Sequence, residues 1–242
     1  MRVFAVLFLS FGISVSGLNI FDNVFQLTDP AIMNLISMAG PSNSAVSDYF
    51  CDLPHLNAMQ IGFNNYVGLD PSYTWKNAST MYFALDMLIA NSTNNYLKVC
   101  QGRKMFYNSM GSTYTDCTNP LFLAGHLPAG GNLSEPYAYG AMWQQLDFIC
   151  NGGLPIGLYS YAALMNVYGT PQGMSCSSTF LTNINNNPTD MCNIVGTYMV
   201  CLQEAYVNSV SNNKPNGWWI CERIRVGYAP YCLGLRCNVL TT

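Results

Sequence analysis

Apolar residues recur at every third or fourth position over much of the chain, which is the spacing of one face of an α-helix. The segment 52–68 shows this pattern, with Asp52 and Pro54 at its start and Gly68 at its end, as is common in helices. Its apolar positions at helical spacing are Leu56, Met59, Phe63 and Val67. Sustained alternation of apolar and polar residues, the mark of a half-buried β-strand, is hard to find. The pattern therefore predicts a mainly α-helical protein.

The same criteria predict further helices and several loops. Helices are expected over residues 29–40, 78–90, 96–110 and 137–150. Another helix is expected to start at a cap on Thr189 or Asp190, and its apolar stripe consists of Val195, Met199, Leu202 and Tyr206. Loops are expected over residues 118–135, 169–178 and 183–188, where turn-forming residues gather. Composition does not change across these loops, so we predict a single cysteine-rich helical domain over residues 18–242.

The first residues have the form of a secretory signal peptide. A single basic residue, Arg2, precedes a short apolar run over residues 3–13. Small residues at Val15 and Gly17 then suit a cleavage site. The apolar run is too short to span a bilayer as a stable helix, and an N-terminal core helix is the alternative interpretation. We therefore expect residues 1–17 to be removed and the mature chain to begin near Leu18.

No later segment is predicted to cross a membrane. The longest apolar run, residues 81–90, is interrupted by Asp86. The final residues, RCNVLTT, contain neither the hydrophobic tail of a lipid-anchor signal nor a retention tetrapeptide. We therefore expect the protein to be secreted into the extracellular space.

The cysteines predict a disulfide framework. All ten follow the predicted signal peptide, and an even number in a secreted chain is typical of complete pairing. They are Cys51, Cys100, Cys117, Cys150, Cys176, Cys192, Cys201, Cys221, Cys232 and Cys237. Their pairing is left open by the sequence. A metal site is the alternative, but no C-x-x-C pair occurs and His55 and His126 are the only histidines, so no metal is expected.

Three N-glycosylation motifs are consistent with the same compartment. They begin at Asn77, Asn91 and Asn132, whereas the similar pattern at Asn187 is excluded because Pro188 follows it. In a secreted chain these motifs predict glycan at three surface positions.

Charge excludes one class of partner. Removal of Arg2 from the nine basic residues leaves eight, against twelve acidic residues, so the mature net charge is −4. There is no basic stripe of the kind that binds nucleic acid, and no nucleic-acid partner is expected. The one basic cluster, Lys98, Arg103 and Lys104, is interpreted as a solvated helix face.

Recognisable catalytic motifs are missing from the sequence. The nearest match to a G-x-S-x-G nucleophile elbow, residues 157–161, lacks its final glycine. H-E-x-x-H, Walker and EF-hand patterns do not occur, and a cysteine protease would need one unpaired cysteine. We therefore predict no catalytic residue and no cofactor.

Two minor possibilities for chemistry stay open. Carboxylates drawn from Glu135, Glu204, Glu222 and the aspartates could act on a glycosidic bond if the fold brought two together. His126 lies in a predicted loop and is the best single candidate for a functional histidine. His55 is expected on the surface of a first helical turn.

The segment NGWWICERIRVGYAPYC, residues 216–232, concentrates charge and tryptophan in a chain that is only 9% charged. If it is helical, one face comprises Trp218, Cys221, Ile224 and Tyr228. Trp219 and Arg223 are then spaced for a cation–π contact on the flank, and Glu222 and Arg225 for an exposed ion pair. We interpret the segment as structural.

Helical segments that carry cysteines also suggest a family resemblance. FICNGG (residues 148–153), YMVCLQEAY (198–206) and WWICERI (218–224) resemble the cysteine-rich helical secreted domains of nematode proteins, including the chondroitin-proteoglycan type. The likeness covers residues 100–237 and rests on the rhythm of the cysteines. It implies a disulfide-rich helical extracellular domain. No Ser-Gly dipeptide follows the signal peptide, so glycosaminoglycan attachment is not expected.

The favoured hypothesis is a secreted disulfide-bonded glycoprotein with a non-enzymatic binding or extracellular structural role. Its partner would be an extracellular protein or a glycan. One alternative is a carrier of a small hydrophobic ligand, because the chain is rich in methionine and tyrosine that could line an apolar cavity. The other alternative is a hydrolase that uses carboxylates in a cleft.

Overall fold

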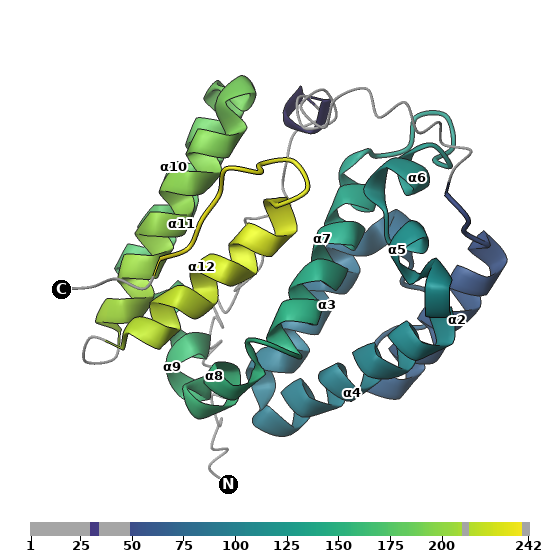
Figure 1. The fold of residues 1–242 in the computed structure, drawn as a ribbon, viewed down its shortest axis with the longest axis horizontal. Helices are drawn as coiled ribbons and strands as arrows, with labels where there is room; N and C mark the ends of the chain where they lie inside the picture. The colour runs from purple at the N-terminus through teal and green to yellow at the C-terminus, as the bar shows by residue number, and fades with distance from the viewer. Residues whose placement is uncertain (1–29, 34–48, 210–212, 239–242) are drawn as a thin grey trace, which may run out of the picture.

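The computed structural model describes residues 30–33, 49–209 and 213–238 (Figure 1). These residues form α-helices and short 3₁₀-helices and contain no β-strand, which confirms the predicted fold class. In chain order the elements are α2 (Leu53–Val67), η2 (Trp75–Asn77), α3 (Ala78–Asn91), α4 (Thr93–Met110), η3 (Gly111–Thr113), α5 (Tyr114–Cys117), α6 (Pro120–Ala124), α7 (Ser134–Ile149), α8 (Leu154–Tyr159), α9 (Tyr161–Asn166), η4 (Val167–Gly169), α10 (Pro171–Asn186), η5 (Pro188–Asp190), α11 (Met191–Asn208) and α12 (Lys214–Tyr228). The predicted signal peptide, residues 1–17, lies outside the described residues.

Local sequence signals explain where most helices begin and end. The helix α2 starts after Asp52 with Pro54 in its first turn, and it ends at Gly68, whose φ of 95° favours glycine. The helix α4 begins three residues before its predicted start because the Ser92 side chain accepts a hydrogen bond from Asn95 N at 3.2 Å. Of the helix predicted over residues 29–40, only 30–33 are described, and these are helical.

Two predicted loops are wrong. Residues 169–178 were expected to be irregular, but α10 starts at Pro171 and contains Cys176. Thr170 acts as its N-cap, accepting a hydrogen bond from Gly173 N at 3.1 Å, and Pro171 suits the first helical position. The helix continues to Asn186, through most of the asparagine-rich segment 183–188. Thr170 and Pro171 therefore start a helix, whereas the prediction interpreted them as part of a loop.

The predicted loop 118–135 is also partly helical. Its first residues include α6, a short helix that begins at Pro120. The side-chain Oδ1 of Asn119 caps this helix, accepting hydrogen bonds from Leu121 N at 2.8 Å and Phe122 N at 3.3 Å.

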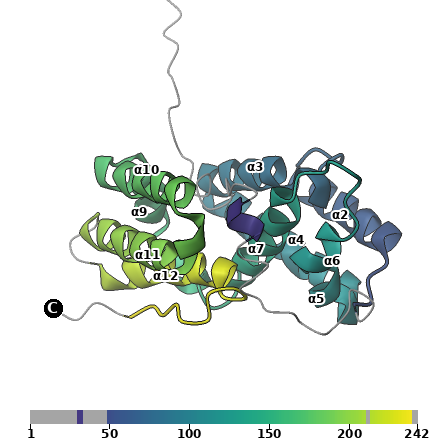
Figure 2. The ribbon, with the colours of Figure 1, turned by 90° about the horizontal axis from the view of Figure 1, so that it is seen from above.

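The helices form two groups that meet along α7 and α12. In Figures 1 and 2, α2 to α7 lie on one side of the molecule and α10 to α12 on the other. Within the first group α2 packs on α4, and α3 packs on both α4 and α7. Within the second group α11 packs between α10 and α12. Eleven of the sixteen residues of α7 are buried, because this helix is covered by α3 and α6 on its own side and by α12 on the other.

Five disulfides pair all ten cysteines of the chain. The first group of helices has Cys51–Cys117 and Cys100–Cys150, and the second has Cys176–Cys201, Cys192–Cys232 and Cys221–Cys237. The predicted disulfide framework is therefore confirmed. No bridge joins the two groups, so the contact between α7 and α12 is non-covalent.

The buried face of α12 is wider than predicted, and it includes Cys221, Ile224 and Tyr228 as expected. Trp218 was expected on the buried face, but it is partly exposed, whereas Trp219 and Arg223 are 1% and 2% exposed. The prediction of a flanking position for Trp219 and Arg223 was wrong because α12 packs against α7 and α11 at once, so its buried face is wide. The Arg223 guanidinium does lie over the Trp219 ring, at 5.3 Å, as the spacing predicted.

Candidate functional site

A cleft of about 960 Å³ lies between α11 and the segment Tyr231–Arg236, which we call the C-terminal cleft. Its lining residues are Cys192, Asn193, Gly196, Thr197, Met199, Val200, Cys201 and Glu204 from α11, and Tyr231, Cys232, Leu233, Gly234, Leu235 and Arg236 from the segment. One wall is therefore a regular helix and the other is irregular chain.

The irregular wall exists because α12 cannot continue. Pro230 lacks a backbone N–H and disfavours further helix, and the chain turns with Cys232 N donating to Tyr228 O at 2.9 Å. The segment then runs back along the helices of the second group (Figure 1). Cys192–Cys232 attaches it to α11, and Cys221–Cys237 attaches it to α12. Both ends of the wall are thus covalently fixed.

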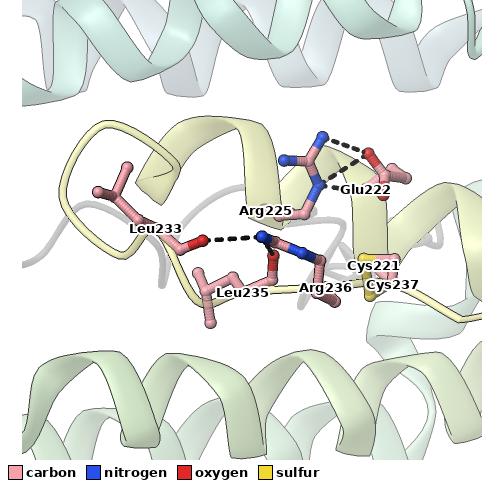
Figure 3. Close-up of polar contacts among 7 residues, drawn as sticks. All are labelled: Cys221, Glu222, Arg225, Leu233, Leu235, Arg236 and Cys237. Carbon is pink, nitrogen blue, oxygen red and sulfur yellow. Dashed lines mark hydrogen bonds and ion pairs between the residues drawn. A yellow bond between two sulfur atoms is a disulfide. The ribbon is translucent and has the colours of Figure 1, made fainter.

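Arg236 shapes this wall from within. Its Nη1 donates hydrogen bonds to Leu233 O and Leu235 O, each at 2.7 Å (Figure 3). The guanidinium thus satisfies carbonyl groups that have no helix or strand to pair with. The same view shows the Glu222–Arg225 ion pair on α12, in which Arg225 Nη2 lies 2.7 Å from Glu222 Oε2. The predicted pair is thus present, but it is partly buried rather than exposed, and the hydrogen bonds to Glu222 raise the pKa of Arg225.

The lining of the C-terminal cleft is mainly apolar and suits binding. Val200 on α11 and Leu233 on the irregular wall leave 53% and 78% of their surface exposed, so each wall offers an accessible apolar side chain. Gly196 leaves space in the helical wall, since an added Cβ would meet only Leu235 Cδ2, at 3.7 Å. Glu204 is the one carboxylate of the lining, whereas hydrolysis of a glycosidic bond by carboxylates needs a pair.

The other glutamates that were considered for catalysis have separate positions. Glu135, in the first turn of α7, accepts a hydrogen bond from Ser79 N at 2.8 Å and so links α7 to α3. Glu222 is engaged with Arg225, as described above. The arrangement therefore assigns these two carboxylates to local contacts.

The two histidines lie outside the C-terminal cleft and apart from each other along the chain. His126 follows α6, is exposed, and has Nδ1 2.8 Å from Phe122 O. His55 is on α2, with Nε2 3.2 Å from Ser109 O. Each imidazole thus contacts a backbone carbonyl of a neighbouring turn or helix. Among the described residues no group of three histidines, cysteines or acidic residues is placed to hold a metal ion.

The three predicted glycosylation sites all belong to the first group of helices. Asn77 is partly exposed just before α3, Asn91 is the exposed last residue of α3, and Asn132 is exposed just before α7. Asn132 Oδ1 accepts hydrogen bonds from Ser134 N and Oγ, at 2.9 and 2.7 Å. None of the three lines the C-terminal cleft, and their modification stays a prediction.

One member of the predicted basic cluster is not on a solvated face. Lys98 and Lys104 are exposed, but the Arg103 side chain is only 12% exposed and forms an ion pair with Asp147. Sequence reasoning also missed the pair formed by Arg223 Nη2 and Asp86 Oδ1, 3.6 Å apart in the core. The available signal was Asp86 itself, a charge within the longest apolar run of residues 18–242. Such a residue requires a partner of opposite charge.

None of the helices in the described ranges has the length and apolar character needed to cross a membrane. The chain matches no protein-family model, no characterised protein sequence and no solved structure.

Proposed function

We propose that the protein is a secreted, disulfide-bonded glycoprotein that binds an apolar segment of an extracellular protein in its C-terminal cleft. The observation that carries this proposal is the pair of exposed apolar side chains, Val200 and Leu233, on walls held by two disulfides. Because the walls are already fixed, the protein loses little conformational entropy when a partner binds, which favours affinity.

The predicted glycans support a protein partner at this cleft. All three sequons lie before or within the first group of helices, and the chain from residue 150 onward contains none. Glycan on the first group would leave α11 and the C-terminal segment uncovered. A surface that binds another protein must stay accessible in this way.

The test is to fill the cleft without disturbing the fold. Gly196→Leu places an apolar side chain in the cleft, and leucine is a better helix former than glycine by roughly 0.8–1 kcal/mol. The matched control is Gly62→Leu, at an exposed position of α2 where an added Cβ meets no atom within 4 Å. A displayed library of random peptides is selected on the secreted wild-type protein, and selected peptides are measured by calorimetry against both variants.

Apolar peptides that bind wild type and Gly62→Leu but not Gly196→Leu would support the proposal. Selection of no peptide, or of peptides that bind Gly196→Leu equally well, would contradict it.

A carrier of a small hydrophobic ligand is the second candidate. The cleft volume of about 960 Å³ is within the range of ligand pockets, roughly 300–1,000 Å³. A carrier, however, encloses most of its ligand, and exposed Val200 and Leu233 fit that requirement poorly. Native mass spectrometry of the secreted protein tests this candidate, since a carrier would retain a small molecule that Gly196→Leu loses.

Kinship with the nematode cysteine-rich secreted domains is a separate proposal. It rests on the rhythm of the cysteines over residues 100–237. A structure of a chondroitin-proteoglycan-type domain would test it through its disulfides. Kinship requires bridges equivalent to Cys176–Cys201, Cys192–Cys232 and Cys221–Cys237.

A further inference from the structure

The turn between α7 and α8, residues 150–153, carries one of the two Asn-Gly pairs of the chain. Its asparagine and glycine, Asn151 and Gly152, are both exposed. The other pair, Asn216 and Gly217, lies near the start of α12, and both of its residues are buried. The two pairs have the same sequence and opposite surroundings, so they can be compared within one molecule.

An Asn-Gly pair can react with itself, because glycine has no side chain to obstruct the approach of the two groups. The backbone nitrogen of the glycine attacks Cγ of the asparagine and gives up its proton. The Cγ–Nδ2 bond breaks, and ammonia leaves. Water then opens the resulting cyclic imide at one of its two carbonyls, and the product is aspartate or isoaspartate. Water is therefore the only co-reactant.

The backbone nitrogen of Gly152 is available for this attack. It donates no hydrogen bond within the described part of the chain, whereas the amides of Asn151 and Gly153 both donate to Phe148 O, at 3.2 and 2.8 Å. A Cβ added to Gly152 would meet no atom within 4 Å. The peptide unit thus has room to turn toward the Asn151 side chain.

The Asn151 side chain is held by one exposed contact. Its Nδ2 donates to Asp147 O at 2.7 Å, and this carbonyl belongs to the last turn of α7. Water competes for both groups at an exposed position, so the contact opens without unfolding of the domain.

The second pair is enclosed by the packing of α11 on α12. Asn216 is 0% exposed. A Cβ added to Gly217 would lie 2.5 Å from Val207 Cγ2 and 2.8 Å from Gln203 O, both on α11. The peptide unit of Gly217 therefore cannot turn unless the two helices move apart.

We propose that Asn151–Gly152 is a site of spontaneous deamidation in the folded protein, and that Asn216–Gly217 is protected from the same reaction. The site is independent of the C-terminal cleft, whose lining includes none of these four residues.

Deamidation loosens the end of α7. The reaction replaces Asn151 Nδ2, a donor, with a carboxylate oxygen that cannot donate to Asp147 O. The new negative charge also lies at the C-terminus of α7, where the helix dipole disfavours it. The altered turn adjoins the Cys100–Cys150 bridge and Gly153 O, which accepts a hydrogen bond from Trp219 Nε1 of α12 at 2.9 Å.

Ageing of the secreted full chain at physiological temperature and pH tests the proposal. Samples taken over several weeks are reduced and digested with chymotrypsin at mildly acidic pH, which suppresses deamidation during handling. Mass spectrometry follows two expected peptides, residues 149–158 and 207–218, for the mass gained when NH₂ is replaced by OH. The controls are wild type reduced and unfolded in urea, and the variant Asn151→Gln.

We expect Asn151 to react about tenfold faster than Asn216 in the folded protein, because a buried residue reacts only when the fold opens locally. In urea the two should react at similar rates, since both pairs are then exposed. Asn151→Gln should show no mass gain in residues 149–158. Equal rates in the folded protein would overturn the proposal, and so would an Asn151 that reacts in urea but not in the folded chain.

The effect on α7 is measured with the variant Asn151→Asp, which has the charge of the product. It should unfold at a lower temperature than wild type. The matched control is Asn94→Asp, which makes the same change at an exposed position in the first turn of α4, where the helix dipole favours negative charge. Asn94→Asp should unfold at the wild-type temperature or higher. An unchanged unfolding temperature for Asn151→Asp would overturn the loosening of α7.

Discussion

At the scale of single residues, the core of this protein is organised around a few buried polar groups. Arg223 and Asp86 are 2% and 1% exposed, and their charged groups lie 3.6 Å apart. Arg223 Nε also donates to Gln145 Oε1 at 3.2 Å, and the Tyr82 hydroxyl donates to the same oxygen. These residues come from α3, α7 and α12, so the network connects the two groups of helices. The buried charge of Asp86 on α3 is tolerated because Arg223 on α12 supplies the opposite charge.

Removing one charge of this pair should be strongly destabilising. We expect Arg223→Met to lower the free energy of unfolding by about 3–5 kcal/mol, because Asp86 would then be a buried charge without its counter-ion. Urea unfolding of the protein with its disulfides intact, followed by circular dichroism, measures the change. The control is the double variant Arg223→Met with Asp86→Leu, which should recover much of the loss since both charges are gone. If the single and double variants lose the same free energy of unfolding, the unpaired charge of Asp86 is not the cause of the destabilisation.

At the scale of elements, caps and close helix contacts decide the arrangement. Thr170 places α10 where a loop was expected, and Gly227 lets α12 approach α7 closely. A Cβ on Gly227 would lie 3.0 Å from Gln145 Nε2 and 3.6 Å from Ala141 Cβ. A larger residue there would move α12 away from α7, together with the buried network.

The cap of α10 can be tested by one substitution. Thr170→Ala should reduce the free energy of unfolding by about 0.5–2 kcal/mol, because the amide of Gly173 loses its side-chain acceptor. Thr170→Ser keeps the hydroxyl and should remain close to wild type. Thermal unfolding of the three proteins side by side gives the comparison. If alanine and serine have the same effect, the hydroxyl does not cap the helix in solution.

At the scale of the whole molecule, covalent and non-covalent contacts are divided between regions. Two disulfides lie in the first group of helices and three in the second, while the packing of α7 on α12 has none. Each bridge in a domain of this type stabilises the fold by about 2–5 kcal/mol. The C-terminal cleft is therefore built within the half that has most of the covalent links.

The intact mass of the secreted protein tests the predicted processing. We expect a chain that begins near Leu18, loses mass when its glycans are removed, and gains no alkyl groups without prior reduction, because all ten cysteines are paired. Reduction followed by alkylation should add ten groups and serves as the control. A mass without glycan would contradict the predictions at Asn77, Asn91 and Asn132. Alkylation before reduction would contradict the five bridges.

The fold class and most helix positions could be predicted from local patterns alone. Helical spacing of apolar residues and start and stop signals such as Pro54 and Gly68 act within a few residues, so they can be read along the chain. The number of bridges followed from an even cysteine count. Local patterns failed at Thr170 and Pro171, where the same two residues suit a turn or a helix start and packing of Phe180 and Ile184 against the core supports the helix.

The pairing of the cysteines, the wide buried face of α12 and the C-terminal cleft depend on packing between distant segments. The bridges join cysteines 16 to 66 residues apart, and such pairings depend on which helices lie side by side. Arg223 is buried because two helices cover α12, which its own sequence does not reveal. The C-terminal cleft combines residues of α11 with the segment that follows α12. Local chemistry therefore sets the helices, because its signals act within a few residues, while long-range packing decides the cysteine pairing and creates the cleft.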